Sequence, residues 1–139
     1  MTGDFIMSSH AVYPALAPGV PATPSRKIMG ELLRDKMGFK GLAISDDLEM
    51  GAINEEKGLH EGAADAFEAG IDLLLICKDQ SLLRESIEHL RNKLLRGEIS
   101  YKRLHESLRR IAETKNRFLS PRRRVILKRV REYFRDLRE

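Results

Sequence analysis

Three short runs of consecutive apolar residues, each followed by a helical pattern, constrain the fold of this 139-residue chain most strongly. The runs are Phe5–Met7, Leu42–Ile44 and Leu73–Ile76. Continuous rather than alternating apolar character is typical of parallel strands that are covered on both faces. Strands that alternate with helices at this spacing imply right-handed crossovers. The sequence therefore predicts an α/β fold with about three β/α units in one parallel sheet, followed by additional C-terminal helices.

Glycines and capping residues predict where the helices begin and end. Thr23 is expected to cap the first helix, with Pro24 in its first turn and Gly38 as a left-handed residue after its end. The other helices are expected over Leu59–Ala69 before Gly70, from Asp79 to Gly97, from Ser100 to about Phe118, and after Ser120-Pro121. The third is expected to bury Leu83, Ile87, Leu90 and Leu94, and the fourth Leu104, Leu108, Ile111 and Phe118.

The number of strands limits the architecture. Three parallel strands do not close a barrel, and a complete (β/α)₈ TIM barrel typically has about 250 residues. The chain of 139 residues is one domain at most. The pattern is therefore either a small open sheet or the C-terminal part of a larger barrel.

Each predicted strand is followed by a polar or reactive side chain, namely His10, Asp46 and Cys77. In parallel α/β folds the ligand site lies at the carboxyl ends of the strands. Asp46 is the best candidate and His10 is a weaker one, although polar residues also simply mark where strands stop. Cys77 is expected to be a small buried filler. Asp47 is not expected to pair with Asp46 in catalysis, because neighbouring side chains on a strand point to opposite sides.

Composition excludes several classes of protein. One cysteine excludes an internal disulfide and makes a cysteine-based zinc site implausible. No apolar run approaches about 20 residues, and the N-terminus has no basic region typical of a signal peptide. We therefore expect a cytoplasmic protein without a membrane partner. Eight Lys/Arg against three acids from Pro121 onward account for the net charge of +4, so the basic character belongs to the tail.

The stretch from Leu32 to Asp46, LLRDKMGFKGLAISD, resembles the active-site signature of family 3 glycoside hydrolases. The aspartate at the end of that signature is the family's nucleophile, and it falls on Asp46. Further segments resemble the bacterial β-N-acetylhexosaminidase branch of the family: 6–16, 21–25, 47–50, 69–77 and 97–115. The resemblance covers about residues 4 to 119, and its motifs occur in the family's order.

The resemblance implies a fold, a reaction and a site. Residues 1–119 would be part of the family's TIM-barrel domain, and residues 120–139 a basic C-terminal helix. Asp46 would attack the anomeric carbon of a β-linked N-acetylglucosamine saccharide and form a covalent glycosyl-enzyme, which water cleaves with retained configuration. His10 and Met50 would bind substrate, with an ordered structural histidine as the alternative for His10, and no metal or organic cofactor would be needed. The cytoplasmic members of this branch act on cell-wall fragments during peptidoglycan recycling.

The same resemblance implies that part of the active site is missing from these residues. In this branch the general acid/base is a histidine paired with an aspartate on a loop before the first of the three strands. His60, His89 and His105 match no family position and are expected on solvated helix surfaces. Because loss of a general acid typically costs about 10²–10⁴-fold in rate, the chain is expected to be inactive by itself. Its unpaired strand edge predicts self-association or pairing with a complementary half-barrel.

Two other hypotheses remain open. The chain could be a non-catalytic interaction module that completes a partner chain bearing the missing half. Alternatively, Arg122-Arg123-Arg124 and the basic helix after them could bind nucleic acid through phosphate contacts, a less favoured interpretation because basic terminal helices are usually solvated.

Overall fold

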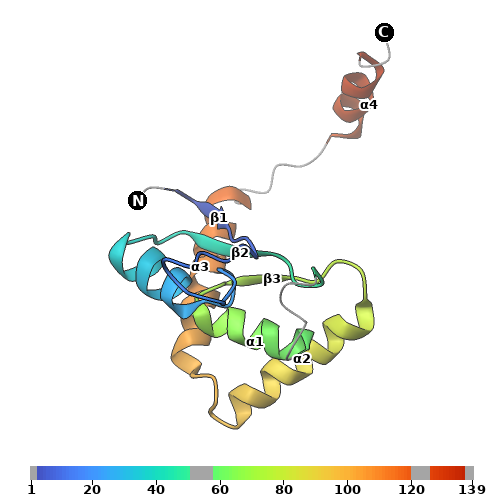
Figure 1. Cartoon of the computed structure of the whole chain (residues 1–139). Helices are drawn as coiled ribbons and strands as arrows, with labels where there is room; N and C mark the ends of the chain where they lie inside the picture. Colours follow the sequence, from blue (N-terminus) through green and yellow to red (C-terminus); the bar gives the residue numbers. More distant parts are fainter. Residues whose placement is uncertain (1–2, 51–57, 120–125, 137–139) are drawn as a thin grey trace.

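A parallel three-stranded sheet forms the centre of the chain (Figure 1). The computed structural model describes residues 3–50, 58–119 and 126–136. The strands are β1 (Phe5–Met7), β2 (Leu42–Asp47) and β3 (Leu73–Leu75), in the order β1-β2-β3. Both strand pairs are parallel, with Ile6 opposite Ala43 and Ile44 opposite Leu73. The predicted α/β class and the parallel direction of the strands are confirmed.

The middle strand is longer than its apolar run. β2 continues through Ser45 to Asp47, with an irregular register against β3 between Ile44 and Asp47. Asp46 and Asp47 are therefore the last residues of a strand, and the main chain at these two positions is held within the sheet.

Helices alternate with the strands and then follow them (Figure 1). They are η1 (Arg26–Lys36), α1 (Leu59–Ala69), α2 (Gln80–Leu95), α3 (Tyr101–Leu119) and α4 (Leu127–Asp136). The bounds of α1 agree with the prediction, and Asp79 caps α2 as expected by accepting hydrogen bonds from the main-chain N–H groups of Ser81 and Leu82. None of the helices in the described ranges has the length and apolar character of a membrane span.

The first helix begins later than predicted. Ser25, not Thr23, caps η1, and its hydroxyl accepts a hydrogen bond from the N–H of Ile28 at 3.3 Å. Thr23 is instead fully buried, because its hydroxyl bonds to the Ser8 hydroxyl at 2.8 Å and to the main-chain carbonyl of Ser9 at 3.0 Å. At the other end, Gly38 has the predicted left-handed conformation, with φ of 64°.

The core lies where η1 and α1 pack against the sheet. Met29 and Leu33 of η1 contact Ala43 of β2 and the small residues Ala66 and Ala69 of α1. Small side chains let the helices approach closely, and a Cβ atom at Gly70, where φ is 127°, would lie 3.3 Å from the carbonyl oxygen of Met29. A second cluster, around Phe67 and Ile99, joins α1 to α2 and α3.

The predicted apolar faces of the later helices are partly wrong. Ile87 of α2 is exposed, as are Leu108 and Phe118 of α3, whereas Ser86 and Ser107 are buried. Other predicted core positions hold, since Leu90, Leu94 and Leu104 pack against the cluster around Phe67. Hydrophobic periodicity failed on α3 because this helix turns a polar face, described below, toward the sheet.

The basic tail segment contains the expected last helix. Figure 1 draws α4 apart from the sheet and from the helices that cover it. Arg122-Arg123-Arg124 lie outside the described residues. The division of the chain at residues 119 and 120 stays a prediction.

Candidate functional site

The three parallel strands have their carboxyl ends on the same side of the sheet. This side, called the rim, contains His10, Asp46 and Cys77. His10 contacts the last residue of β2. Its Nε2 donates to the main-chain carbonyl of Asp47 at 3.0 Å, because a carbonyl oxygen can only accept, and its Nδ1 lies 2.9 Å from the Thr23 hydroxyl. Both ring nitrogens are thus engaged within the protein. His10 fastens the loop after β1 to the end of β2.

Asp46 lies at the end of the middle strand, within the stretch where the register between β2 and β3 shifts. The Asp46 side chain is half-buried, and its Oδ1 accepts a hydrogen bond from the N–H of Asp47 at 2.8 Å. One carboxylate oxygen is therefore stabilised by the main chain.

Asp47 has different partners from Asp46. Its Oδ1 accepts a hydrogen bond from the N–H of Glu49 at 3.2 Å, and its carboxylate interacts with the thiol of Cys77. The two adjacent acids are thus separated in role, as strand alternation predicts. Asp47 shapes the turn that leaves β2.

Glu49 joins the loops after β2 and β3, a function that the sequence did not predict. Its carboxylate accepts hydrogen bonds from three consecutive main-chain N–H groups, those of Cys77 at 2.8 Å, Lys78 at 2.5 Å and Asp79 at 3.0 Å. Because an ionised acceptor strengthens each bond, this contact holds the ends of β2 and β3 in a defined relation. No local sequence signal marks it, since the partners are about 30 residues away.

Cys77 is exposed, so its prediction as a buried filler is wrong. The strand before it ends at Leu75, and the chain has already turned toward solvent at Cys77. Partial desolvation, followed by the negative charge of Asp47, raises the pKa of the Cys77 thiol. A raised pKa leaves less thiolate at neutral pH, which argues against a nucleophilic function.

Met50 also lies at this rim. Its side chain is 51% exposed, and its N–H donates to the carbonyl oxygen of Asp47 at 3.1 Å. The same oxygen accepts from His10, so the predicted site residues His10, Asp46 and Met50 converge on the end of β2. The chain that follows, residues 51–57, lies outside the described ranges.

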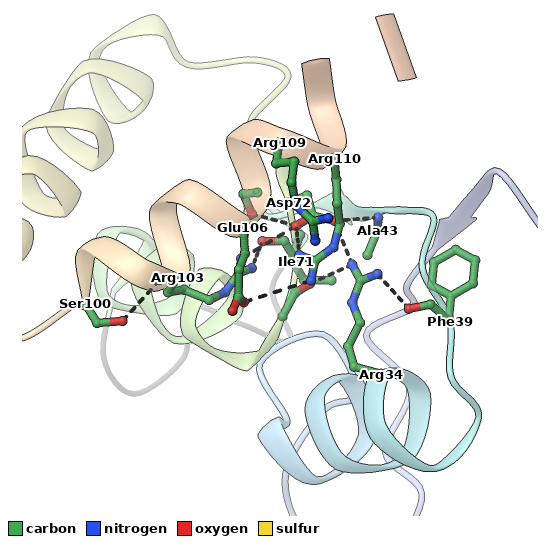
Figure 2. A network of polar contacts seen from close by, with 12 residues as sticks. Arg34, Phe39, Ala43, Ile71, Asp72, Ser100, Arg103, Glu106, Arg109 and Arg110 are labelled. Atoms are coloured by element: carbon green, nitrogen blue, oxygen red, sulfur yellow. Dashed lines mark hydrogen bonds and ion pairs between the residues drawn. The ribbon is translucent and has the colours of Figure 1, made fainter. Parts of the chain in front are cut away.

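A second polar cluster lies at the amino ends of the strands, on the side of the sheet opposite the rim (Figure 2). Asp72, just before β3, has a side chain with no accessible surface. Its Oδ2 accepts from Arg34 at 2.6 Å and from the N–H of Ala43 at 3.0 Å, and its Oδ1 accepts from Ser107 at 2.6 Å and Arg110 at 2.9 Å. Arg103 lies 3.6 Å from the same oxygen. Three elements, η1, β2 and α3, therefore meet on one buried carboxylate.

The arginines of this cluster are held by the fold. Burial lowers the pKa of Arg34 and of Arg103, while the charge of Asp72 acts in the opposite direction. Arg34 also donates to the carbonyl of Gly41 at 2.6 Å, and Arg103 to that of Ile71 at 2.6 Å. A charged hollow of about 970 Å³ opens beside them, between η1 and α3. In parallel α/β barrels the active site lies at the carboxyl ends of the strands, whereas the amino ends contribute to stability. We therefore assign the Asp72 cluster and the hollow beside it to stability and not to catalysis.

The prediction that all three helix histidines lie on solvated surfaces is wrong for two of them. His105 is exposed, but His60 and His89 lie between α1 and α2 with their rings 5.9 Å apart. His89 Nε2 lies 2.7 Å from Glu61, whose other oxygen accepts from Lys93 at 2.6 Å. These polar side chains join the two helices. In the described part of the chain, no group of three or more His, Cys, Asp or Glu side chains is arranged to hold a metal.

Comparison with known proteins relates this arrangement to a family. A β-hexosaminidase from Alkalilimnicola ehrlichii is 39% identical over 85 residues, which are 61% of this chain and 24% of that protein. The structure of a glycoside hydrolase family 3 β-N-acetylglucosaminidase from Paenibacillus sp. superposes with a TM-score of 0.84 at 33% identity, over 88% of this chain and 24% of that one. The β-N-acetylhexosaminidase from Beutenbergia cavernae superposes with a TM-score of 0.75 at 30% identity, over 81% and 33%.

These proteins are longer than the chain, which spans between about a quarter and a third of each. The sequence also matches the N-terminal domain of glycosyl hydrolase family 3 over residues 2–114. That match includes the whole sheet, the rim with Asp46 and the Asp72 cluster. The chain therefore belongs to glycosyl hydrolase family 3.

Proposed function

We propose that this chain is the nucleophile-bearing part of a retaining β-N-acetylglucosaminidase, with Asp46 as the nucleophile. The observation that carries the proposal is the place of Asp46, at the carboxyl end of the middle strand of a parallel sheet. In a (β/α)₈ barrel that position is the catalytic mouth. We infer that the three β/α units are the C-terminal part of such a barrel.

The chemistry needs Asp46 as a carboxylate. One of its oxygens forms a bond to the anomeric carbon while the bond to the leaving oxygen breaks, and a general acid donates a proton to that oxygen. Water then attacks the same carbon as the acid, now a base, removes its proton, and the Asp46 carboxylate leaves. The hydrogen bond from the N–H of Asp47 orients the Asp46 carboxylate. His10 is unsuited to the acid function because both of its ring nitrogens already have partners.

The substrate follows from the relatives. Because they are named as β-hexosaminidase and β-N-acetylglucosaminidase, we infer a saccharide with a β-linked N-acetylglucosamine. The exposed side chain of Met50 lies at the rim, where it could contact the sugar, and His10 positions the main chain beneath it. Peptidoglycan fragments in the cytoplasm are the natural source that the family resemblance suggests.

The sheet supports the idea that other residues complete the site. β1 and β3 are its two edges, and Met7 on β1, which pairs in register with Ile44 of β2, is 59% exposed on one face of the sheet. Open strand edges and exposed apolar side chains favour pairing with another segment. We propose that a complementary first half of the barrel, which carries the general acid, covers this face, and that the 139 residues alone do not turn over substrate.

Complementation tests this function. The chain is mixed with the N-terminal part of a family 3 β-N-acetylglucosaminidase that ends just before the strand equivalent to β1, and hydrolysis of 4-nitrophenyl β-N-acetylglucosaminide is followed. We expect no turnover from either part and measurable turnover from the complex. Asp46→Asn should abolish it, whereas Asp35→Asn, at an exposed position on η1, should not.

Two results would contradict the proposal. An assembled complex whose activity survives Asp46→Asn would show that Asp46 is not the nucleophile. Turnover by the 139 residues alone, at a rate similar to that of an intact relative, would show that they contain their own general acid.

A further inference from the structure

The C-terminal helix α4 has two chemically distinct faces. Ile126, just before the helix, and Leu127, Val130, Tyr133 and Phe134 recur at the spacing of one helical face, and all five side chains are exposed. The catalytic proposal gives this face no function. An apolar face of this size that remains in water is unfavourable and indicates a binding surface.

Cations border this apolar face. At 100° per residue, Arg129 borders the apolar face on one side and Arg131 borders it on the other. Lys128 and Arg135 follow beyond Arg131, further around the helix from the apolar face. Four cations against two acids, Glu132 and Asp136, give residues 127–136 a net charge of +2. Long basic side chains beside an apolar face can reach anionic groups while their carbon chains stay in apolar surroundings.

We propose that α4 binds the surface of an anionic lipid bilayer, lying in the plane of the interface with its apolar face inward. Such a helix combines an amphipathic pattern, low overall hydrophobicity and basic flanks, and it needs no run long enough to span the membrane. The expectation that the chain has no membrane partner rested on run length alone, so it does not address this mode of binding.

Other occupants fit the two faces less well. Nucleic acid would neutralise the cations but leave Leu127 and Phe134 in water. A second copy of α4 would cover the apolar face but bring Arg129 and Arg131 against like charges along both borders. A surface of anionic headgroups over acyl chains satisfies both faces at once.

Sedimentation of the full chain with lipid vesicles tests the proposal. One set of vesicles is pure phosphatidylcholine and the other contains phosphatidylglycerol. We expect clear preference for the anionic vesicles, since each Lys or Arg near such a surface contributes roughly fivefold to binding. The preference should fall as salt is raised.

A matched pair of variants separates the two faces. Leu127→Gln/Phe134→Gln keeps the charge and should weaken vesicle binding by at least about tenfold, because two apolar side chains no longer enter the bilayer. Lys128→Gln/Glu132→Gln also introduces two glutamines and leaves the net charge unchanged, but it spares the apolar face, so it should bind within about threefold of the parent chain. Circular dichroism checks that both variants keep the secondary structure of the parent chain.

Several outcomes would overturn the proposal. These are no binding to anionic vesicles at low salt, equal binding to both vesicle types, or equal loss in the two variants. Retention of duplex DNA without retention of vesicles would instead support the nucleic-acid hypothesis. Loss of dimers in the Leu127→Gln/Phe134→Gln variant, without vesicle binding by the parent chain, would assign the face to a second copy.

Discussion

Replacing Asp72 by asparagine tests whether charge holds α3 and η1 against the sheet. The substitution nearly preserves volume but removes the only acid whose side chain is fully buried among Arg34, Arg103 and Arg110 in the described structure. Removing one partner of a buried ion pair typically costs about 3–5 kcal/mol, because the other charges stay buried without compensation. Here three guanidinium groups lose that partner. We expect the free energy of unfolding to fall by at least about 3 kcal/mol, a large share of the roughly 5–15 kcal/mol of a typical domain.

Urea denaturation followed by far-UV circular dichroism measures this change. The midpoint should fall while the slope with urea stays constant, since the surface exposed on unfolding is unchanged. Asp35→Asn makes the same chemical change at an exposed position on η1 and should shift stability by no more than about 0.5 kcal/mol. If Asp72→Asn lies within about 1 kcal/mol of this control, the cluster is held by packing and the electrostatic reasoning is refuted.

Other predictions concern single contacts. The hydrogen bond from Lys93 is the main cause that lowers the pKa of Glu61, so its contribution to stability is present above the unfolded pKa and is lost as pH falls through the folded pKa. Glu61→Gln should therefore flatten the acid limb of a plot of melting temperature against pH, and an unchanged limb would contradict this. The thiol of Cys77 should react with iodoacetamide more slowly than free cysteine at pH 8, and Asp47→Asn should accelerate it. Gly70→Ala should cost about 1–3 kcal/mol by thermal denaturation, because φ there is 127°.

The strands and most helix ends were predictable because their signals are local. The apolar run Phe5–Met7 forms the predicted strand, although Phe5 and Met7 are exposed and not buried as expected, and Gly70 ends α1 where the sequence places it. The same reasoning failed at Thr23, whose hydroxyl bonds to Ser8 and Ser9 in the segment that follows β1, about 15 residues earlier in the sequence. A capping residue chosen by spacing alone loses to a buried hydrogen bond.

The rim was predictable in outline. His10 and Asp46 were placed at one edge because parallel strands end together, and the structure agrees. The nucleophilic function of Asp46 came from the family signature and stays a prediction. The three hydrogen bonds accepted by the Glu49 carboxylate were not predictable, since the N–H donors belong to a loop about 30 residues away in the sequence.

Local patterns in the sequence were sufficient for the α/β class and the parallel strands, because the alternation of short apolar runs with helical patterns can be seen in the sequence itself. Which face of α3 is buried depended on the part of the folded chain against which this helix packs. Asp72 is enclosed by the sheet, and a buried carboxylate needs cations and donors, so α3 turns Arg103, Ser107 and Arg110 inward and leaves Leu108 in water. Hydrophobic periodicity cannot indicate that orientation, since the energy that decides it comes from a charge about 35 residues away in sequence.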